Sequence, residues 1–292
     1  MSLSGEPAST HSPAAGRPMV TYIRPTRGWS GIDLRELWRY RELIYFLVWR
    51  DVKVRYKQSL LGAGWAILQP FLTMVVFSIF FGRFLGVPTD GSPYPVFSYA
   101  ALLPWQLVEA GVSKAGTSLV AGRNLVTKVY FPRIAIPMAP ILAGLLDFLL
   151  AAVVFLGMIV YYQMRPGLAV LALPIFLLVT VMTTVGVSLW LAALNVSYRD
   201  VAFVIPFLVR VWFFVTPITY PVSVVPVAYQ PLYWMNPMVG VVEGFRWSLY
   251  AAADGSVFPW GLMAISAAVA LGLMVTGTAF FRRMERTFAD LV

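Results

Sequence analysis

Long apolar runs separated by short polar connections fill the chain from about residue 61 to residue 285. Most of these runs are close to the roughly 20 residues that a helix needs to cross the hydrocarbon core of a bilayer. The pattern predicts an all-α, polytopic membrane protein with six transmembrane helices. We expect the six spans at residues 62–86, 96–113, 134–162, 168–194, 201–220 and 257–281.

A different pattern occupies residues 32–49, where charged and apolar positions alternate at helical spacing. The charged side chains gather mainly on one side, and the apolar ones recur at steps of three and four: Leu34, Leu37, Trp38, Ile44, Tyr45 and Val48. Such a pattern predicts an amphipathic helix that lies in the membrane interface. A basic segment follows it, and because cations do not enter hydrocarbon, the chain must enter the membrane near Leu61. We treat residues 31–60 as one unit and residues 61–285 as the transmembrane domain.

Residues 1–30 contain four prolines and no continuous apolar stretch. They do not resemble a cleavable signal peptide, and their composition predicts a disordered cytoplasmic tail.

Two of the predicted connections are unusual. Residues 114–133 permit a short cytoplasmic helix, at about residues 118–131, before Pro132 resets the direction of the chain. Residues 221–256 are too apolar for a simple loop and too short for two more spans, and prolines and glycines interrupt them. We predict that this region forms short re-entrant helices on the outer side, where protein or a water-filled cavity covers the backbone.

Composition excludes a soluble protein. The chain is 59% hydrophobic and 12% charged, whereas about 25% of the residues of a soluble domain are charged. There is no cysteine, and the single histidine, His11, lies in the tail. The net charge of +9 reflects cations on the cytoplasmic side rather than a nucleic-acid partner.

The distribution of Lys and Arg sets the expected orientation. Ten of these cations precede the first span, from Arg17 to Lys57, and further ones follow the second, fourth and sixth spans. The opposite side carries only Arg83, Arg165 and Arg246. We therefore expect a multi-pass protein with both termini in the cytoplasm, including residues 286–292.

Motifs for catalysis are absent from the sequence. There is no Gly-x-x-x-x-Gly-Lys-Ser/Thr loop to hold ATP phosphates, no His-Glu-x-x-His string and no Gly-x-Ser-x-Gly string. We predict no catalytic residue, no metal site and no cofactor on this chain.

Five charged residues fall within the apolar regions, where an unpaired charge is costly. Glu243 and Arg246 stand three residues apart, a spacing that permits an ion pair within the re-entrant region, where Tyr233 and Trp234 also lie. For Arg210 two hypotheses stay open. It pairs with Asp147 or Glu109, or it presents a cation to an anionic substrate.

Aromatic residues make up 15% of the chain and are frequent in the first and fifth spans. Packing and interfacial belts explain most of them. The functional hypothesis is a channel wall on which sugar rings slide, with these candidates: Trp65, Phe71, Phe77, Phe207, Trp212 and Phe214.

Several strings, in order and spacing, resemble the permease subunit of polysaccharide-exporting ATP-binding-cassette transporters, the Wzm-like family of O-antigen and teichoic-acid exporters. They cover about residues 33–285: Trp49–Tyr56, Leu61–Pro70, Leu102–Trp105, Asn124–Pro132, Asn195–Val201, Thr216–Pro221 and Asn236–Pro237. Arg210 stands where the family leads us to expect an uncharged residue.

The resemblance implies a homodimer around a channel in the bacterial inner membrane. It also implies two separate ATPase subunits, which would bind ATP and Mg, and a lipid-linked polysaccharide as cargo. It makes the helix at 32–49 a gate helix and the helix at 118–131 a coupling helix, with a second ATPase contact at residues 195–200. The implied coupling residues are Arg123, Asn124, Lys128, Tyr130, Pro132, Arg133, Tyr198, Arg199 and Asp200.

Four cations at the inner interface, Arg50, Lys53, Arg55 and Lys57, are candidates for docking the pyrophosphate of a polyprenyl carrier. Topology determination and phospholipid binding explain the same cluster equally well. Two other functions remain as alternatives. One is a drug or small-lipid exporter permease of the same superfamily, and the other is a membrane-embedded glycosyl or lipid-phosphate transferase.

Overall fold

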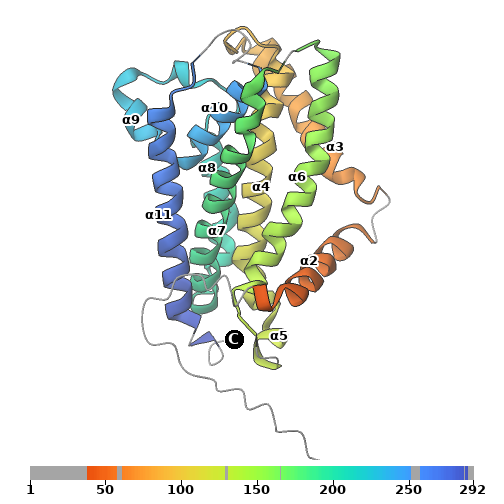
Figure 1. Cartoon of the computed structure of the whole chain (residues 1–292), viewed down its shortest axis with the longest axis vertical. Helices are drawn as coiled ribbons and strands as arrows, with labels where there is room; N and C mark the ends of the chain where they lie inside the picture. The colour runs from red at the N-terminus through yellow and green to blue at the C-terminus, as the bar shows by residue number, and fades with distance from the viewer. Residues whose placement is uncertain are drawn as a thin grey trace, which may run out of the picture. The chain divides into compact units, whose positions relative to one another are not determined.

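The computed structural model describes residues 38–57, 61–128, 131–164, 166–250, 257–285 and 287–288, and the regular elements among these residues are all helices (Figure 1). The predicted tail at 1–30, the first part of the predicted gate helix at 32–37, Tyr130 and most of the C-terminus lie outside the described residues.

Seven helices of 14 residues or more account for most of the described chain. They are α2 (Arg41–Tyr56), α3 (Gly64–Phe77), α4 (Tyr94–Ala121), α6 (Ala135–Tyr161), α7 (Leu173–Ser197), α8 (Val201–Val215) and α11 (Trp260–Glu285). Shorter helices connect them: the π-helical η1 (Ser78–Phe84), α5 (Arg123–Lys128), η2 (Leu168–Ala172), η3 (Val222–Val224), η4 (Val227–Tyr229), α9 (Gln230–Tyr233) and α10 (Pro237–Leu249).

Within the described chain, four helical stretches are long and apolar enough to cross a membrane: Gly64–Phe84, Ala135–Tyr161, Leu168–Ser197 and Trp260–Glu285. They coincide with four of the predicted spans. The other two predicted spans correspond to α4, which is long but less apolar, and to α8, which is apolar but has only 15 residues. The multi-pass helical class is thus confirmed, and the total of six spans stays a prediction.

Helix α4 is the centre of the packing, because it contacts α3, α6, α7, α8 and α10. Side chains along most of its length are buried, among them Tyr99 and Trp105. Two apolar cores form along the bundle. One gathers around Trp105, Phe176 and Phe245, and the other around Leu119 and Phe281.

Helices α7 and α11 approach each other closely at two glycines. A Cβ atom added to Gly277 would overlap the carbonyl oxygen of Gly186, and one added to Gly186 would overlap the backbone at Leu273. Small residues let helix backbones touch, which is how apolar helices gain van der Waals contact inside a membrane. This contact joins the sixth predicted span to the fourth.

Helix α2 ends later than the predicted gate helix, because it continues through the basic segment to Tyr56. It lies against α6 (Figure 1). Leu47 is buried, and Leu43, Ile44 and Val48 pack on the second core. Trp38 and Tyr45, which the sequence placed on the same apolar face, are exposed in the chain. The packed face is therefore narrower than the sequence pattern suggested.

The predicted coupling helix is divided between two elements. Residues 118–121 continue α4 to Ala121, and α5 covers only Arg123–Lys128. In Figure 1, α5 lies at the same end of the bundle as the last turns of α7 and α11. The short helices α9 and α10 lie toward the other end.

Candidate functional site

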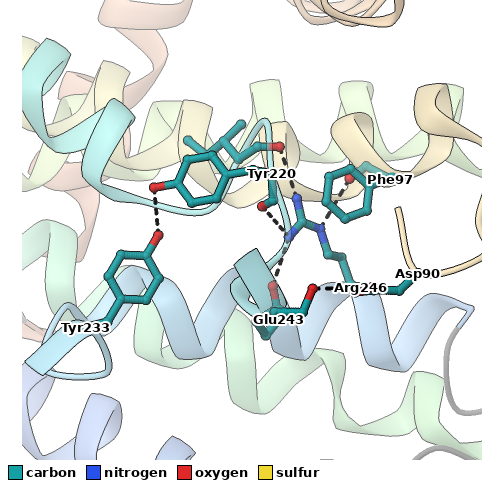
Figure 2. A network of polar contacts seen from close by, with 8 residues as sticks. Asp90, Phe97, Tyr220, Tyr233, Glu243 and Arg246 are labelled. Atoms are coloured by element: carbon teal, nitrogen blue, oxygen red, sulfur yellow. Dashed lines mark hydrogen bonds and ion pairs between the residues drawn. The ribbon is translucent and has the colours of Figure 1, made fainter. Parts of the chain in front are cut away.

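The guanidinium of Arg246 is the hub of a polar network at the end of the bundle that carries α10 (Figure 2). Its Nη1 lies 2.9 Å from Oε1 of Glu243, and its Nη2 donates to the carbonyl of Ile218 at 3.0 Å. Nε donates to the carbonyl of Phe97 at 3.4 Å, and the guanidinium carbon lies 3.5 Å from the centre of the Phe97 ring. The predicted ion pair within the re-entrant region is confirmed.

The cation of this network is buried, since the side chain of Arg246 is 3% exposed, whereas that of Glu243 is 25% exposed and lines a hollow of about 330 Å³. Loss of water raises the pKa of the Glu243 carboxyl, and the charge of Arg246 opposes that rise. Backbone carbonyls and an aromatic ring complete the environment of the cation, so its charge is satisfied without solvent.

The turn after α8 is tied to the start of α10 by the side chain of Asn236. Its Oδ1 accepts from the backbone N–H of Met238 at 3.1 Å and from the indole of Trp212 at 2.9 Å. Its amide donates to Oγ1 of Thr216 at 3.1 Å. Asn236 thus caps α10, with Pro237 in the first turn as helix starts favour.

Tyr233 and Trp234, the other two predicted residues of this region, belong to the same assembly. The hydroxyl of Tyr233 lies 2.9 Å from that of Tyr220, and the Trp234 carbonyl accepts from Ser266 of α11 at 3.0 Å. Tyr233, Arg246 and, through Arg246, Glu243 are therefore brought together with the turn at residues 216–221, and Trp234 is bonded to α11. That the region re-enters the membrane stays a prediction.

At the opposite side of the bundle, the end of α2 binds the middle of α6 through a second carboxylate. The guanidinium of Arg55 forms an ion pair with Asp147, and the hydroxyl of Tyr56 donates to the same carboxylate. The two charged side chains are 19% and 23% exposed. Of the alternatives left open for Arg210, the structure does not show a pairing with Asp147, because Asp147 has its partners on α2.

The four predicted docking cations divide between two faces of α2. Arg50, Lys53 and Lys57 are exposed, and Arg55 faces α6. Arg50 pairs with Asp51 at 2.8 Å, and the ammonium of Lys53 lies 5.5 Å from the centre of the Trp49 ring.

Lys114, just beyond the second predicted span, joins the charges around Arg55. Desolvation and the charge of Arg55 lower the pKa of Lys114 to about 8, and the charge of Asp51 opposes this effect. Sequence reasoning did not single out Lys114, and only its neighbourhood in three dimensions connects it to α2.

Glu109 and Arg210 line one hollow of about 190 Å³ between α4 and α8, together with Trp105, Ser113 and Phe213. Both charged side chains are exposed in the chain. Of the acidic partners considered for Arg210, Glu109 is the one that shares its surroundings. Because α8 is otherwise apolar, its outward face must meet water or protein rather than lipid at this point.

The predicted channel aromatics lie on two neighbouring helices. Phe77 of α3 and Phe213 of α8 have ring centroids 5.8 Å apart. The outward-facing candidates on these two helices are exposed in the single chain: Trp65, Phe71, Phe207 and Phe214. Phe77 and Trp212 are partly buried. The structure therefore places the candidates on adjacent elements without assigning them a ligand.

Most of the predicted coupling residues in the described chain are exposed at one end of the bundle: Arg123, Asn124, Tyr198, Arg199 and Asp200. Arg133 instead binds Glu285 at the end of α11, with its backbone N–H 3.1 Å from Oε1 and its guanidinium on the backbone carbonyl. The side chain of Lys128 lies outside the described residues.

Known proteins resemble this chain over most of its length. The ABC-2 type transporter family matches residues 42–250. An O-antigen export system permease protein from Myxococcus xanthus is 31% identical over 89% of this chain and 98% of its own length. A protein of the same name from Klebsiella pneumoniae is 27% identical over 86% and 95%. A polysialic acid transport protein from Escherichia coli is 23% identical over 66% and 76%.

The chain belongs to the ABC-2 type transporter family. The resemblance predicted from the sequence motifs is thereby confirmed. The match begins within α2 and ends just after α10, so it includes both the Arg55–Asp147 pair and the Arg246 network of this ABC-2 permease.

Sequence reasoning missed two features of this permease. The Arg55–Asp147 pair joins residues on helices far apart in the sequence, and the only signal was that an acid within an apolar span requires a partner. The second feature is the set of carbonyl acceptors around Arg246, which no side-chain pattern encodes.

Proposed function

We propose that this chain is the channel-forming permease subunit of an ATP-driven exporter of lipid-linked polysaccharide, of the O-antigen type. Two copies would enclose the passage in the bacterial inner membrane, with both termini in the cytoplasm. Two ATPase subunits would bind ATP and Mg. The cargo would be a glycan on a polyprenyl pyrophosphate, whose anionic head does not cross hydrocarbon unaided.

The observation that carries this proposal is the similarity to permeases named for O-antigen export, which extends over 89% of the chain. The other relatives are named for O-antigen or polysialic acid transport. These names favour a polysaccharide over a drug or a small lipid. They also favour transport over a membrane-embedded transferase.

The exposed face of α8 supports a passage on that side. It carries Arg210 and the rings of Phe207 and Phe214. Apolar rings alone are compatible with lipid, but a guanidinium in hydrocarbon is not, so this face requires water or a second protein surface. A water-filled passage between two copies supplies both, and aromatic faces there would stack on sugar rings.

The exposed residues at the other end support a docking surface for the ATPase. Helix α5 and the turn at Tyr198–Asp200 present polar side chains at the same end of the bundle (Figure 1). The bond between Arg133 and Glu285 links the start of α6 to the end of α11. A displacement of α5 by the ATPase would therefore be transmitted to two candidate spans, α6 and α11.

The exposed cations of α2 support a contact with phosphate groups of lipid or substrate. Charge reversal by Lys53→Glu should reduce the stimulation of ATPase activity by a polyprenyl pyrophosphate in the reconstituted complex. Stimulation equal to that of the unmodified complex would remove the docking role and leave topology and phospholipid binding as the explanation.

The overall function is tested by deleting the gene in its host and locating the lipid-linked glycan. The proposal predicts that glycan accumulates on the cytoplasmic side and that the intact gene restores export. Restoration must also require an ATPase partner that hydrolyses ATP. Glycan synthesis that stops altogether, with transfer activity in the purified chain, would establish the transferase alternative instead.

A further inference from the structure

The cluster where α2 meets α6 contains three cations, Arg50, Arg55 and Lys114, and two carboxylates, of which Asp51 is paired with Arg50. Arg55 pairs with Asp147, and Lys114 of α4 lies within electrostatic range of Arg55 and Asp51. The cluster therefore has one cation more than it has carboxylates. An added anion is attracted to the excess charge, and it binds Arg55 as well only if it replaces Asp147 there.

Asp147 is the carboxylate that such an anion would replace. It lies near the middle of α6, an apolar span in which a charge without a partner is costly. Its partners in the described chain, Arg55 and Tyr56, both come from the last turn of α2. The attachment of this end of α2 to α6 thus depends on one acidic side chain.

The guanidinium of this pair is also more accessible than that of Arg246, at 19% against 3% exposed. Arg55 and Asp147 are each about one fifth exposed, so an anionic group can approach the guanidinium from outside. A diphosphate carries more negative charge than a carboxylate and offers more acceptor oxygens to the planar guanidinium. It therefore competes well for Arg55, and it gains the second cation of Lys114.

We propose that Asp147 is a resident counter-ion, and that the diphosphate of an amphiphilic substrate replaces it at Arg55 and Lys114 and so releases the end of α2 from α6. The inference rests on the proposed function, which supplies a lipid diphosphate as substrate. It adds that Arg55 exchanges Asp147 for the diphosphate, so that the position of α2 depends on whether substrate is bound. The diphosphate binds only the state in which Arg55 has left Asp147. It therefore shifts the equilibrium toward the state in which the end of α2 is free of α6.

Release of α2 is measured as a distance. The chain contains no cysteine, so Val54→Cys on α2 and Leu149→Cys on α6, both exposed positions, accept one pair of spin labels in each copy of the chain. In nanodiscs, farnesyl diphosphate should lengthen the distance between the labels, and farnesol, which lacks the diphosphate, should not. In an Asp147→Asn background the longer distance should be present before any ligand is added.

Affinity is measured in the reconstituted complex with its ATPase subunits. Asp147→Asn removes the competitor, so the concentration of farnesyl diphosphate that half-stimulates ATPase activity should fall about tenfold. Lys114→Gln should raise it and leave the label distance in the absence of ligand unchanged. Glu42→Gln, the same chemical change at an exposed position of α2, is the matched control and should change neither measurement.

The outcomes separate this inference from the proposed function. If farnesyl diphosphate stimulates the ATPase but the label distance stays constant, the release of α2 is overturned and the substrate class stands. A half-stimulating concentration that is unchanged or higher in Asp147→Asn also overturns it. If farnesyl diphosphate neither stimulates the ATPase nor changes the distance, the lipid diphosphate substrate and the exchange both fall.

Discussion

Two guanidinium–carboxylate pairs in this permease differ in how completely the protein surrounds them. Arg246 and Glu243 lie on one helix, and the cation is 3% exposed, with carbonyls and a ring around it. Arg55 and Asp147 lie on two helices and are each about one fifth exposed. The two carboxylates are similarly exposed, so the difference lies in the cations: the fold encloses the guanidinium of Arg246, whereas that of Arg55 leaves room for another ligand.

The difference teaches which kind of ion pair holds structure and which can exchange partners. Removing one partner of a buried pair leaves a charge that nothing else stabilises. At a partly exposed pair, water screens the loss, and a competing anion can take the place of the carboxylate. Burial rather than distance therefore separates the two roles, and each prediction below tests that separation.

The largest effect is expected at Arg246. Arg246→Leu leaves Glu243 without its cation and several carbonyls without a donor, so the free energy of unfolding should fall by about 3–5 kcal/mol. Thermal unfolding of the purified chain in detergent, followed by tryptophan fluorescence, measures it. Arg246→Lys should recover less than half of the loss because a single ammonium does not reproduce the planar fork. A loss below about 1 kcal/mol would contradict the structural role.

Glu243→Gln sharpens the same comparison. Arg246 keeps its bonds to the carbonyls of Ile218 and Phe97, so this variant should lose about 1–3 kcal/mol, less than Arg246→Leu. The same unfolding assay decides the order. Equal losses in the two variants would show that the ion pair, and not the hydrogen bonds from Arg246 to the backbone carbonyls, stabilises the region.

At the second pair we expect a smaller loss of stability. Asp147→Asn removes the charge that binds Arg55, and because the pair is only partly buried, unfolding should become easier by about 1 kcal/mol. A loss as large as that of Arg246→Leu would remove the distinction between the two pairs.

Arg210 tests a third situation, a cation that is exposed in the chain on an apolar helix. Arg210→Met should change the free energy of unfolding of the monomeric chain by no more than about 0.5 kcal/mol. If the face lines a passage, export of glycan by the complex should change even though folding does not. A clear loss of stability in the monomer would instead indicate a structural pair with Glu109.

The smallest effect is expected at the exposed pair of Arg50 and Asp51, whose side chains are 43% and 22% exposed. Arg50→Gln should alter the unfolding free energy by about 0–1 kcal/mol, as exposed ion pairs do. It serves as the baseline for the other variants. A loss comparable to that of Asp147→Asn would show that exposure does not rank these pairs.

Some parts of this structure could be read from the residues directly. Four of the predicted spans coincide with apolar helices, because the length of an apolar run is a local property that the membrane imposes. The spacing of Glu243 and Arg246 likewise predicted their ion pair. The family could also be recognised from short strings, and the match over residues 42–250 confirmed it.

Other features depended on contacts between distant segments. One alternative from the sequence paired Asp147 with Arg210, whereas in the structure Asp147 pairs with Arg55. The coupling helix was expected as one piece, but its first turn belongs to α4. Helix α2 has a packed face that excludes Tyr45. In each case the periodicity of apolar residues predicts a helix, but it does not predict which other helix its side chains contact.

By itself, the sequence determined that this protein is a helical membrane protein of the ABC-2 type, because hydrophobic length and local motifs are properties of contiguous residues. Only the tertiary structure decided which charges are enclosed and which are accessible. A guanidinium has the same chemistry at positions 55, 210 and 246, and its surroundings come from helices that the chain brings together across long separations. Those surroundings set the cost of removing each charge, and with it the role that each arginine has.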